Sequence, residues 1–298
     1  MNLLVAVVLS MRPQQWIKNL VVFAALVFAQ ELTDPSLLLR TVLAALLFCG
    51  VSGAVYILND LFDADRDRLH PIKARRPIAS GALGSAPALA VAALLLSASL
   101  MAGFILSPPF GAVLLIYLIL NIVYTMWWKD VVIIDVMSIA AGFVLRAVGG
   151  GVMIGVKISS WLIMCTILLS LFLAVCKRRQ ELAGLAGPEQ HRSILREYSV
   201  GLLDQMINVV TASTVVTYTF YTLSPEVERK LGTPHLYLTV PFVLYGIFRY
   251  LYLIHQRGEG GNPARALLAD RALLVCVALW GLMVVLLLYA WRPDAAIP

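Results

Sequence analysis

Acidic residues gather in one short stretch, Asn59-Asp60-Leu61-Phe62-Asp63-Ala64-Asp65-Arg66-Asp67, directly after a long apolar segment. If a helix continues through it, Asn59 and three of the four aspartates share an arc of about 100°, and Asp65 faces the opposite way. Three carboxylates on one face repel each other unless a cation neutralises them. Oxygen ligands that leave room for water and phosphate suit Mg²⁺. The spacing therefore predicts that Asp60, Asp63 and Asp67 bind Mg²⁺, with Asn59 beside them.

Basic residues follow at once, since Lys73, Arg75 and Arg76 lie between Pro71 and Pro77, which end any helix. A cation site next to such groups can hold a diphosphate, because the metal bridges phosphate oxygens while arginine bonds them in pairs. The alternative is a charge-balanced surface loop whose basic residues only set the membrane topology. The register of three aspartates at the end of an apolar helix favours the metal and diphosphate site.

Two ionisable residues, Asp135 and Arg146, lie inside the apolar segment 131–155. Their spacing puts them on one stripe of a helix together with Ser138 and Gly142, about 16 Å apart and therefore too far to pair directly. Such groups are costly inside a membrane unless they face a polar cavity or a partner. The stripe predicts one wall of a polar, substrate-binding cavity that opens to the cytoplasm. The alternative is that each residue pairs with another helix.

Further substrate-binding candidates lie near the ends of other apolar segments. Lys177 and Glu181 are four residues apart, so they either form a helical ion pair or contribute to a second anion-binding wall in which Glu181 serves metal or ribose. Lys129 serves equally well as a membrane anchor beside Trp127 and Trp128. The remaining substrate-binding candidates of this kind are Lys18, Tyr124 and Arg178.

Long apolar segments have to position all of these residues. Of the 298 residues, 60% are hydrophobic and only 13% are charged, whereas a soluble domain carries about a quarter charged residues. The composition predicts an all-α polytopic membrane protein, a single domain over residues 1–298, built as a helical bundle around a cavity that faces the cytoplasm. About nine transmembrane helices are expected, at residues 16–30, 37–58, 86–106, 109–127, 131–155, 158–176, 201–222, 236–255 and 272–291.

The basic residues indicate how the chain is oriented. Sixteen of the 23 Lys and Arg fall on one side of the nine spans and five on the other, which is the positive-inside pattern. The N-terminus and the acidic motif are thus expected in the cytoplasm and the C-terminus outside, in the inner cell membrane. The net charge of +6 belongs to this topology, so no nucleic-acid partner is expected. Four scattered cysteines indicate neither a disulfide framework nor a zinc site.

The motif Asn-Asp-x-x-Asp-x-x-x-Asp at the end of the second span resembles the first aspartate motif of the UbiA superfamily of intramembrane prenyltransferases, and the nine-span layout is similar. Four further stretches resemble the branch of that superfamily that transfers phosphoribose to polyprenyl phosphate: 12–19, 59–81, 141–146 and 177–181. Typical users of prenyl diphosphates carry a second aspartate motif after the sixth span. This chain has Lys177-Arg178-Arg179 there, with Glu181 as the nearby acid.

The resemblance implies a UbiA-type bundle and an Mg²⁺-dependent transferase. The aspartates would hold Mg²⁺ on phosphoribosyl diphosphate, and the basic turn would hold its phosphates. Polyprenyl phosphate, with its tail in the bilayer, would attack ribose C1 as diphosphate leaves. An ionised phosphate needs no general base, so catalysis would rest on positioning and charge stabilisation. The acceptor phosphate would meet Lys129, Arg146 and Lys177.

Two alternatives stay open at this point. One is a prenyltransferase that uses a prenyl diphosphate to alkylate an aromatic or other acceptor. The other is a transporter or lipid-binding scaffold with a cation site, although transporters usually place their charges near the membrane midplane. Neither the oligomeric state nor the polyprenyl chain length follows from these motifs.

Overall fold

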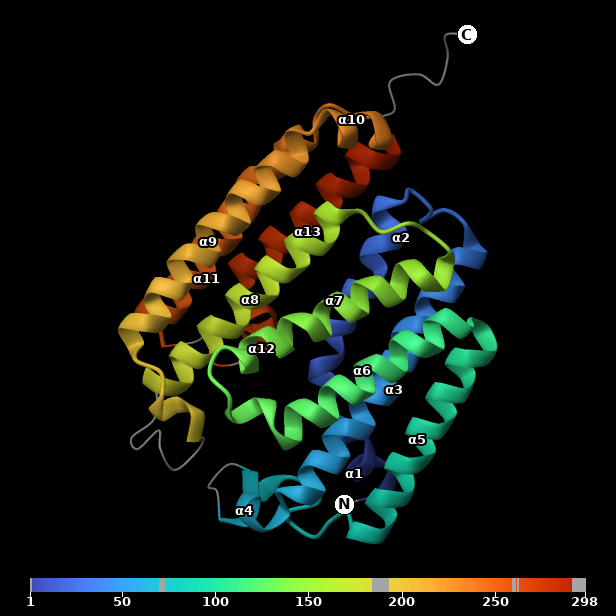
Figure 1. Cartoon of the computed structure of the whole chain (residues 1–298), viewed down its shortest axis with the longest axis vertical. Helices are drawn as coiled ribbons and strands as arrows, with labels where there is room; N and C mark the ends of the chain where they lie inside the picture. Colours follow the sequence, from blue (N-terminus) through green and yellow to red (C-terminus); the bar gives the residue numbers. More distant parts are fainter. Residues whose placement is uncertain (1, 70–72, 184–192, 259–260, 262, 291–298) are drawn as a thin grey trace.

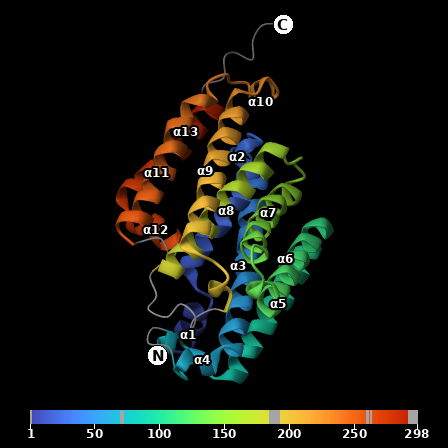
Figure 2. The ribbon, with the colours of Figure 1, turned by 60° about the vertical axis from the view of Figure 1, so that its left-hand side comes forward.

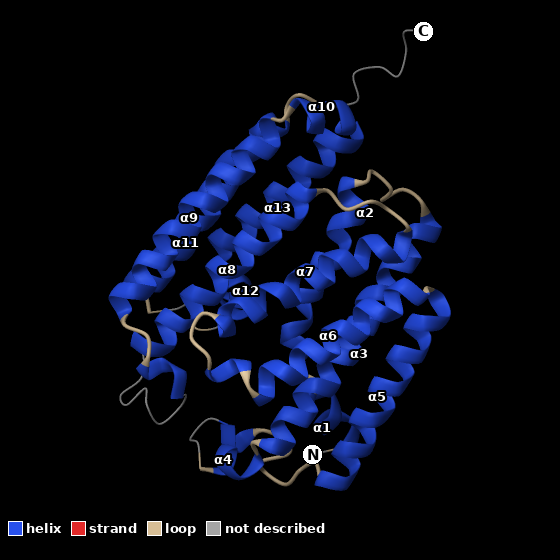
Figure 3. Cartoon of the chain, in the orientation of Figure 1, coloured by secondary structure: helices blue, strands red, loops and turns tan. Residues whose placement is uncertain are grey.

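The computed structural model describes residues 2–69, 73–183, 193–258, 261 and 263–290, and within these residues it contains helices and loops but no strand (Figure 3). The all-α prediction is confirmed. The short helical elements are α1 Leu3–Ser10, η1 Pro13–Phe23, α2 Ala24–Phe28, α4 Ala64–Arg68, η2 Lys73–Arg75, η3 Trp128–Asp130, η5 Ser193–Arg196, α10 Pro225–Leu231, η6 Leu236–Thr239 and α12 Pro263–Ala269.

Eight helical segments in the described part of the chain are long and apolar enough to cross a membrane. They are α3 Pro35–Phe62, α5 Ser85–Leu106, α6 Pro108–Met126, α7 Ile134–Ile154, α8 Ser160–Ala183, α9 Val200–Leu223, η6 with α11 Val240–Gln256, and α13 Arg271–Val285 with η7 Leu286–Ala290. The protein is therefore an integral membrane protein.

The first predicted span, 16–30, takes a different form from the other eight. It consists of the 3₁₀ helix η1 followed by the short helix α2. Arg12 begins η1 in a left-handed conformation, with φ of 55°, and Pro13 occupies its first turn. An 11-residue 3₁₀ helix is long for its type, so tertiary packing has to support it. The eight long helices and this segment together agree with the expected number of about nine spans.

Glycines of α7 supply that packing. A Cβ added at Gly150 would lie 2.0 Å from the backbone oxygen of Val22 in η1, and one at Gly149 would lie 2.7 Å from the ring of Phe48 in α3. The glycine triplet at 149–151 therefore allows close packing, and α7 continues through it without a break. The 3₁₀ segment is pressed directly against the backbone of α7.

The bundle is elongated, with its long helices running between two ends (Figures 1 and 2). Helices that follow each other in the chain pack together, including α3 with α5, α7 with α8, and α8 with α9. Both views place α1 and α4 at one end and α10 at the other. The acidic motif therefore lies at a single end of the molecule.

Candidate active site

The acidic motif spans the junction between α3 and α4. Asp63 ends α3, and its backbone N–H donates to the carbonyl oxygen of Asn59 at 2.9 Å. The N–H of Asp67 donates to the Asp63 carbonyl oxygen at 2.8 Å, so a nearly helical path continues into α4. This path keeps Asp60 and Asp67 on the inner side, where each is only 3% exposed. Asp65 points outward and pairs with Arg68 at 2.7 Å, as the helical spacing predicted.

Arg76 joins the two buried carboxylates. Its Nη1 donates to Asp60 Oδ1 at 3.0 Å and to Asp67 Oδ2 at 2.6 Å. Asp60 Oδ1 and Asp67 Oδ2 both contact the Nη1 atom of Arg76, so these two carboxylates lie close together. Lys73 adds a weaker contact, with Nζ 3.9 Å from Asp67 Oδ1. The basic turn therefore contacts the acidic motif through Arg76 and Lys73, whereas Arg75 is exposed, and the predicted binding of diphosphate by this turn stays a prediction.

The predicted convergence of three carboxylates needs a correction. In the described residues, no group of three His, Cys, Asp or Glu side chains is close enough to hold one metal ion. Asp63 is half-buried at the helix junction, where its φ of −93° and ψ of 5° interrupt the helix. Arg76, and not Asp63, lies between the other two aspartates. Two buried carboxylates need neutralising charge, and the arginine supplies it.

Arg12 was not predicted as a site residue. Its Nη2 donates to Asp60 Oδ1 at 2.5 Å, and its guanidinium lies 4.9 Å from the ring centre of Tyr56. Arg12 stands 48 positions before Asp60 in the chain, so helical periodicity gives no sign of the contact. The only sequence signal was its place in the stretch 12–19, which carries part of the family resemblance.

Arg146 lies deep in the bundle and is 6% exposed. Its Nε donates to Asn19 Oδ1 at 2.7 Å, its Nη1 to the Gly142 carbonyl oxygen at 2.9 Å and its Nη2 to the Tyr117 hydroxyl at 2.6 Å. Each of these three partners is uncharged. The rings of Tyr117 and Phe143 lie 4.7 and 5.3 Å from the guanidinium carbon, and no carboxylate in the described part of the chain pairs with it, so its charge is available to an anion.

Lys18 extends this positive region. The side chain lies within electrostatic range of Arg12, Arg146 and Lys177. Arg12 contacts the acidic motif, and Lys177 belongs to the basic segment at the end of α8, so Lys18 interacts electrostatically with a residue of each region. The structure thus brings together predicted site residues from η1, α7 and α8.

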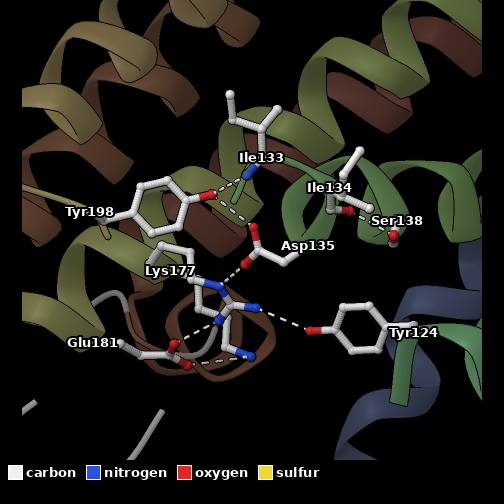
Figure 4. A network of polar contacts seen from close by, with 9 residues as sticks. Tyr124, Ile133, Ile134, Asp135, Ser138, Lys177, Glu181 and Tyr198 are labelled. Atoms are coloured by element: carbon white, nitrogen blue, oxygen red, sulfur yellow. Dashed lines mark hydrogen bonds and ion pairs between the residues drawn. The ribbon is translucent and has the colours of Figure 1, made fainter. Parts of the chain in front are cut away.

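Asp135 and Arg178 form a fully buried ion pair (Figure 4), each with 0% of its side chain exposed. Arg178 Nε donates to Asp135 Oδ2 at 2.5 Å, while its Nη1 donates to Glu181 Oε2 at 2.6 Å and its Nη2 to the Tyr124 hydroxyl at 3.2 Å. Unlike Arg146, Arg178 contacts two carboxylates, Asp135 and Glu181, which neutralise its charge, so the structure gives Asp135 and Arg178 a buried ion pair while their substrate-binding role stays a prediction. The sequence left open whether Asp135 and Arg146 line a cavity or pair with other helices. The structure shows the pairing, since Asp135 contacts Arg178 of α8, and Arg146 contacts Asn19 of η1 and Tyr117 of α6.

Tyr198 completes this network and was also missed from the sequence. Its hydroxyl donates to Asp135 Oδ1 at 2.8 Å and accepts the backbone N–H of Ile133 at 2.8 Å. Burial raises the pKa of Tyr198 to about 12, so the hydroxyl stays protonated at neutral pH and can donate. Asp135 stands 63 positions away in the chain, and no spacing rule connects residues at that separation.

Other predicted residues lie at the ends of their helices. Lys177 is about a third exposed, and its Nζ lies 3.6 Å from Glu181 Oε1, which confirms the helical ion pair. Glu181 therefore contacts both Lys177 and Arg178 (Figure 4). Lys129 is half-buried in η3, and the neighbouring Trp127 and Trp128 are exposed, as expected for residues near a membrane surface.

Known proteins resemble the chain over most of its length. Residues 19–269 match the model of the UbiA prenyltransferase family. The decaprenyl-phosphate phosphoribosyltransferase of Corynebacterium glutamicum is 30% identical, over 97% of this chain and 88% of that protein. The protein of the same name from Mycolicibacterium smegmatis is also 30% identical, over 94% of this chain and 91% of that protein.

Solved structures show the same fold. A UbiA homologue from Archaeoglobus fulgidus, bound to GPP and Mg²⁺, superposes with a TM-score of 0.72 at 19% identity and covers 94% of this chain and 99% of that one. The apo structure of a UbiA homologue from Aeropyrum pernix K1 gives 0.68 at 14% identity, over 91% and 98%. These findings confirm the resemblance carried by the aspartate motif. The chain belongs to the UbiA prenyltransferase family.

Proposed function

We propose that this protein transfers phosphoribose from phosphoribosyl diphosphate to a polyprenyl phosphate and releases diphosphate. The observation that supports the proposal is that the chain carries one acidic motif and one basic segment, with Lys18 in electrostatic range of both Arg12 and Lys177. Asp60 and Asp67 lie at the end of α3 and in α4, and Lys177 lies near the end of α8. One acidic and one basic motif suit two substrates that both carry phosphate, and the phosphoribosyltransferase relatives support the same choice.

The acidic motif fits a hard divalent cation, for which Mg²⁺ is our proposal. Asp60 and Asp67 offer only carboxylate oxygens, and those oxygens already share one cationic partner, the Nη1 of Arg76. These two aspartates would hold the ion, with Asp63 and Asn59 beside them. The ion would neutralise the negative charge that develops on the leaving diphosphate. The diphosphate oxygens would be bound by Arg12, Lys73 and Arg76, because cationic side chains form strong hydrogen bonds with phosphate.

The acceptor phosphate would be held by Arg146 and Lys177, which lie within electrostatic range of Lys18. Arg146 keeps its positive charge because its three partners are neutral, and Lys177 is partly exposed. A phosphate oxygen held there is already ionised at neutral pH and can attack ribose C1 directly. The apolar helices around the site would keep the prenyl tail in the bilayer. Lys129 is a further candidate for the same phosphate.

The distribution of basic residues supports an orientation with this site in the cytoplasm. Lys and Arg concentrate on the side of the spans that carries the acidic motif and the end of α8. Phosphoribosyl diphosphate is a water-soluble cytoplasmic metabolite, so its site has to open on that side. We therefore place the N-terminus inside the cell and the C-terminus outside.

A labelled-donor assay tests the proposal. The purified protein in lipid nanodiscs is incubated with ribose-labelled phosphoribosyl diphosphate, a polyprenyl phosphate and Mg²⁺, and labelled lipid is extracted into organic solvent. We expect labelled lipid from the wild type and about a 100-fold lower rate from D60N and D67N, because each removes a charge from the metal site. D65N is the matched control, since Asp65 is in the same motif but exposed.

The same assay separates the alternatives. Absence of labelled lipid, together with turnover of a prenyl diphosphate and an aromatic acceptor, would overturn the proposal in favour of prenyl transfer. A scaffold or transporter would show neither product, and D67N would behave like the wild type in lipid binding.

A further inference from the structure

The turn that begins α7 is strained. Ile133 has a φ of 68° and a ψ of −43°, and the N–H of Ile134 donates to the carbonyl oxygen of Val132 at 2.8 Å. These values describe a γ-turn with a positive φ, which is a rare and strained form. The strain is greatest for a β-branched residue such as isoleucine, because its Cβ crowds the backbone in that region. Functional sites are where such strain is commonly stored.

Packing of the isoleucine side chain does not hold this turn, since that side chain is 51% exposed. A backbone hydrogen bond holds the turn instead, because the N–H of Ile133 donates to the Tyr198 hydroxyl at 2.8 Å. An N–H at the start of a helix has no partner inside the helix, so the phenol serves as its cap. Tyr198 itself is 5% exposed and follows η5, whose Ile194 and Leu195 are buried.

The same hydroxyl fixes the ion pair behind the basic segment. Tyr198 donates to Oδ1 of Asp135, while Arg178 donates to Oδ2 of the same carboxylate. Arg178 then holds Glu181 Oε2, and Glu181 Oε1 lies against Lys177 Nζ. One line of contacts therefore runs from the strained turn to the partly exposed amine of Lys177 (Figure 4).

We infer that Tyr198 is a positioning residue, which locks the Ile133 turn and the Asp135–Arg178 pair so that Lys177 is presented to the phosphate of the polyprenyl acceptor. The inference rests on the proposed function for the identity of that acceptor. Tyr198 touches neither substrate in this account. Its hydroxyl acts through Asp135, Arg178 and Glu181.

The test compares Y198F with Y218F. Tyr218 is a matched control, because its hydroxyl is also buried with two partners, Thr239 and Trp280, but in the cluster that contains Leu231 and Leu287. We expect Y198F to raise the KM for polyprenyl phosphate about tenfold, the size expected when a hydrogen bond to a charged group is lost. The KM for phosphoribosyl diphosphate should change less than about twofold, and Y218F should leave both values near wild type. Equal effects of the two variants, or a parallel rise of both KM values in Y198F, would overturn the inference.

A second variant tests the strained turn directly. Glycine adopts a positive φ without strain, so I133G should need the phenol less. We expect the double variant I133G/Y198F to have a KM for polyprenyl phosphate between those of Y198F and the wild type, because glycine relieves the turn but does not replace the hydrogen bond to Asp135. A KM equal to that of Y198F would overturn the inference that Tyr198 locks the Ile133 turn. If Y198F alone fails to fold, the effect of losing the Tyr198 hydroxyl is measured by comparing the acceptor KM of I133G/Y198F with that of I133G.

Amide hydrogen exchange keeps this inference separate from the proposed function. In Y198F, protection at the amide of Ile133 should fall, and in Y218F it should stay as in the wild type, whatever reaction the protein catalyses. Unchanged protection would overturn the inference. If the wild type makes no labelled lipid, and Y198F nevertheless loses protection at the Ile133 amide, the proposed function is contradicted and the inference about Tyr198 stands.

Discussion

Arg12 donates a hydrogen bond to Asp60 across 48 positions of the chain, and so ties the segment before η1 to the end of α3. Arg12 is about a third exposed, whereas Asp60 is nearly buried. The guanidinium therefore has room to contact a substrate on one side while it holds the carboxylate on the other.

R12A is expected to lower kcat/KM for phosphoribosyl diphosphate about 10- to 100-fold, the range for loss of a hydrogen bond to a charged group. R40A is the control, because Arg40 is exposed and lies about 30 Å from Asp60 along the same helix, α3. Steady-state kinetics with labelled donor measure both variants. Equal activity of R12A and R40A would exclude a role for Arg12.

N19D should separate stability from activity. Asn19 Oδ1 accepts from Arg146 Nε at 2.7 Å, so an aspartate of the same shape would place a full negative charge against this guanidinium. We expect an unchanged or higher thermal midpoint, because a buried cation gains a counter-ion. The KM for polyprenyl phosphate should rise at least about tenfold, because the charge that attracts the phosphate is neutralised. An unchanged acceptor KM would argue against phosphate binding at Arg146.

G150A should destabilise the fold. Its Cβ would lie 2.0 Å from the Val22 oxygen, and backbone cannot move aside as a flexible side chain does. We expect a loss of about 1–3 kcal/mol in unfolding free energy, the usual cost of overpacking. Thermal unfolding in detergent, compared with G201A, measures it, because a Cβ at Gly201 meets nothing within 4 Å. A wild-type midpoint for G150A would mean that η1 does not pack as described.

Chelation should abolish transfer. If Asp60 and Asp67 hold a divalent ion, excess EDTA removes activity, and Mg²⁺ or Mn²⁺ should restore it better than Zn²⁺, because the donors are oxygens only. D67N should need a higher Mg²⁺ concentration for half-maximal rate, and D65N should not. Full activity in EDTA would contradict the metal site.

Periodicity predicted those parts of the site that depend on a single helix. The outward direction of Asp65 and the inward direction of Asp60 and Asp67 followed from the helical rotation, because hydrogen bonding stays nearly helical across the junction at Asp63. The i,i+4 spacing of Lys177 and Glu181 allowed either an ion pair or an anion-binding wall, and the structure shows the ion pair.

Contacts between distant segments could not be predicted in that way. Rotation along α7 places Asp135 on a face but does not say which helix packs there, so the pairing with Arg178 and Tyr198 was left open. The 3₁₀ form of η1 likewise depends on its contact with Gly150, a residue far along the chain. A strained turn at Ile133 has no sequence signal at all, because isoleucine disfavours it.

The junction at Asp63 has a mechanical consequence. Asp60 belongs to a long helix that is fixed in the bundle, whereas Asp67 belongs to a five-residue helix attached through one residue outside regular helical geometry. A rotation about the backbone of Asp63 that separates the two carboxylates would have to break the hydrogen bonds that Asp63 and Asp67 donate across the junction. Because Arg76 contacts both carboxylates, it would also have to release one of them, so Arg76 and the junction together set the distance between Asp60 and Asp67.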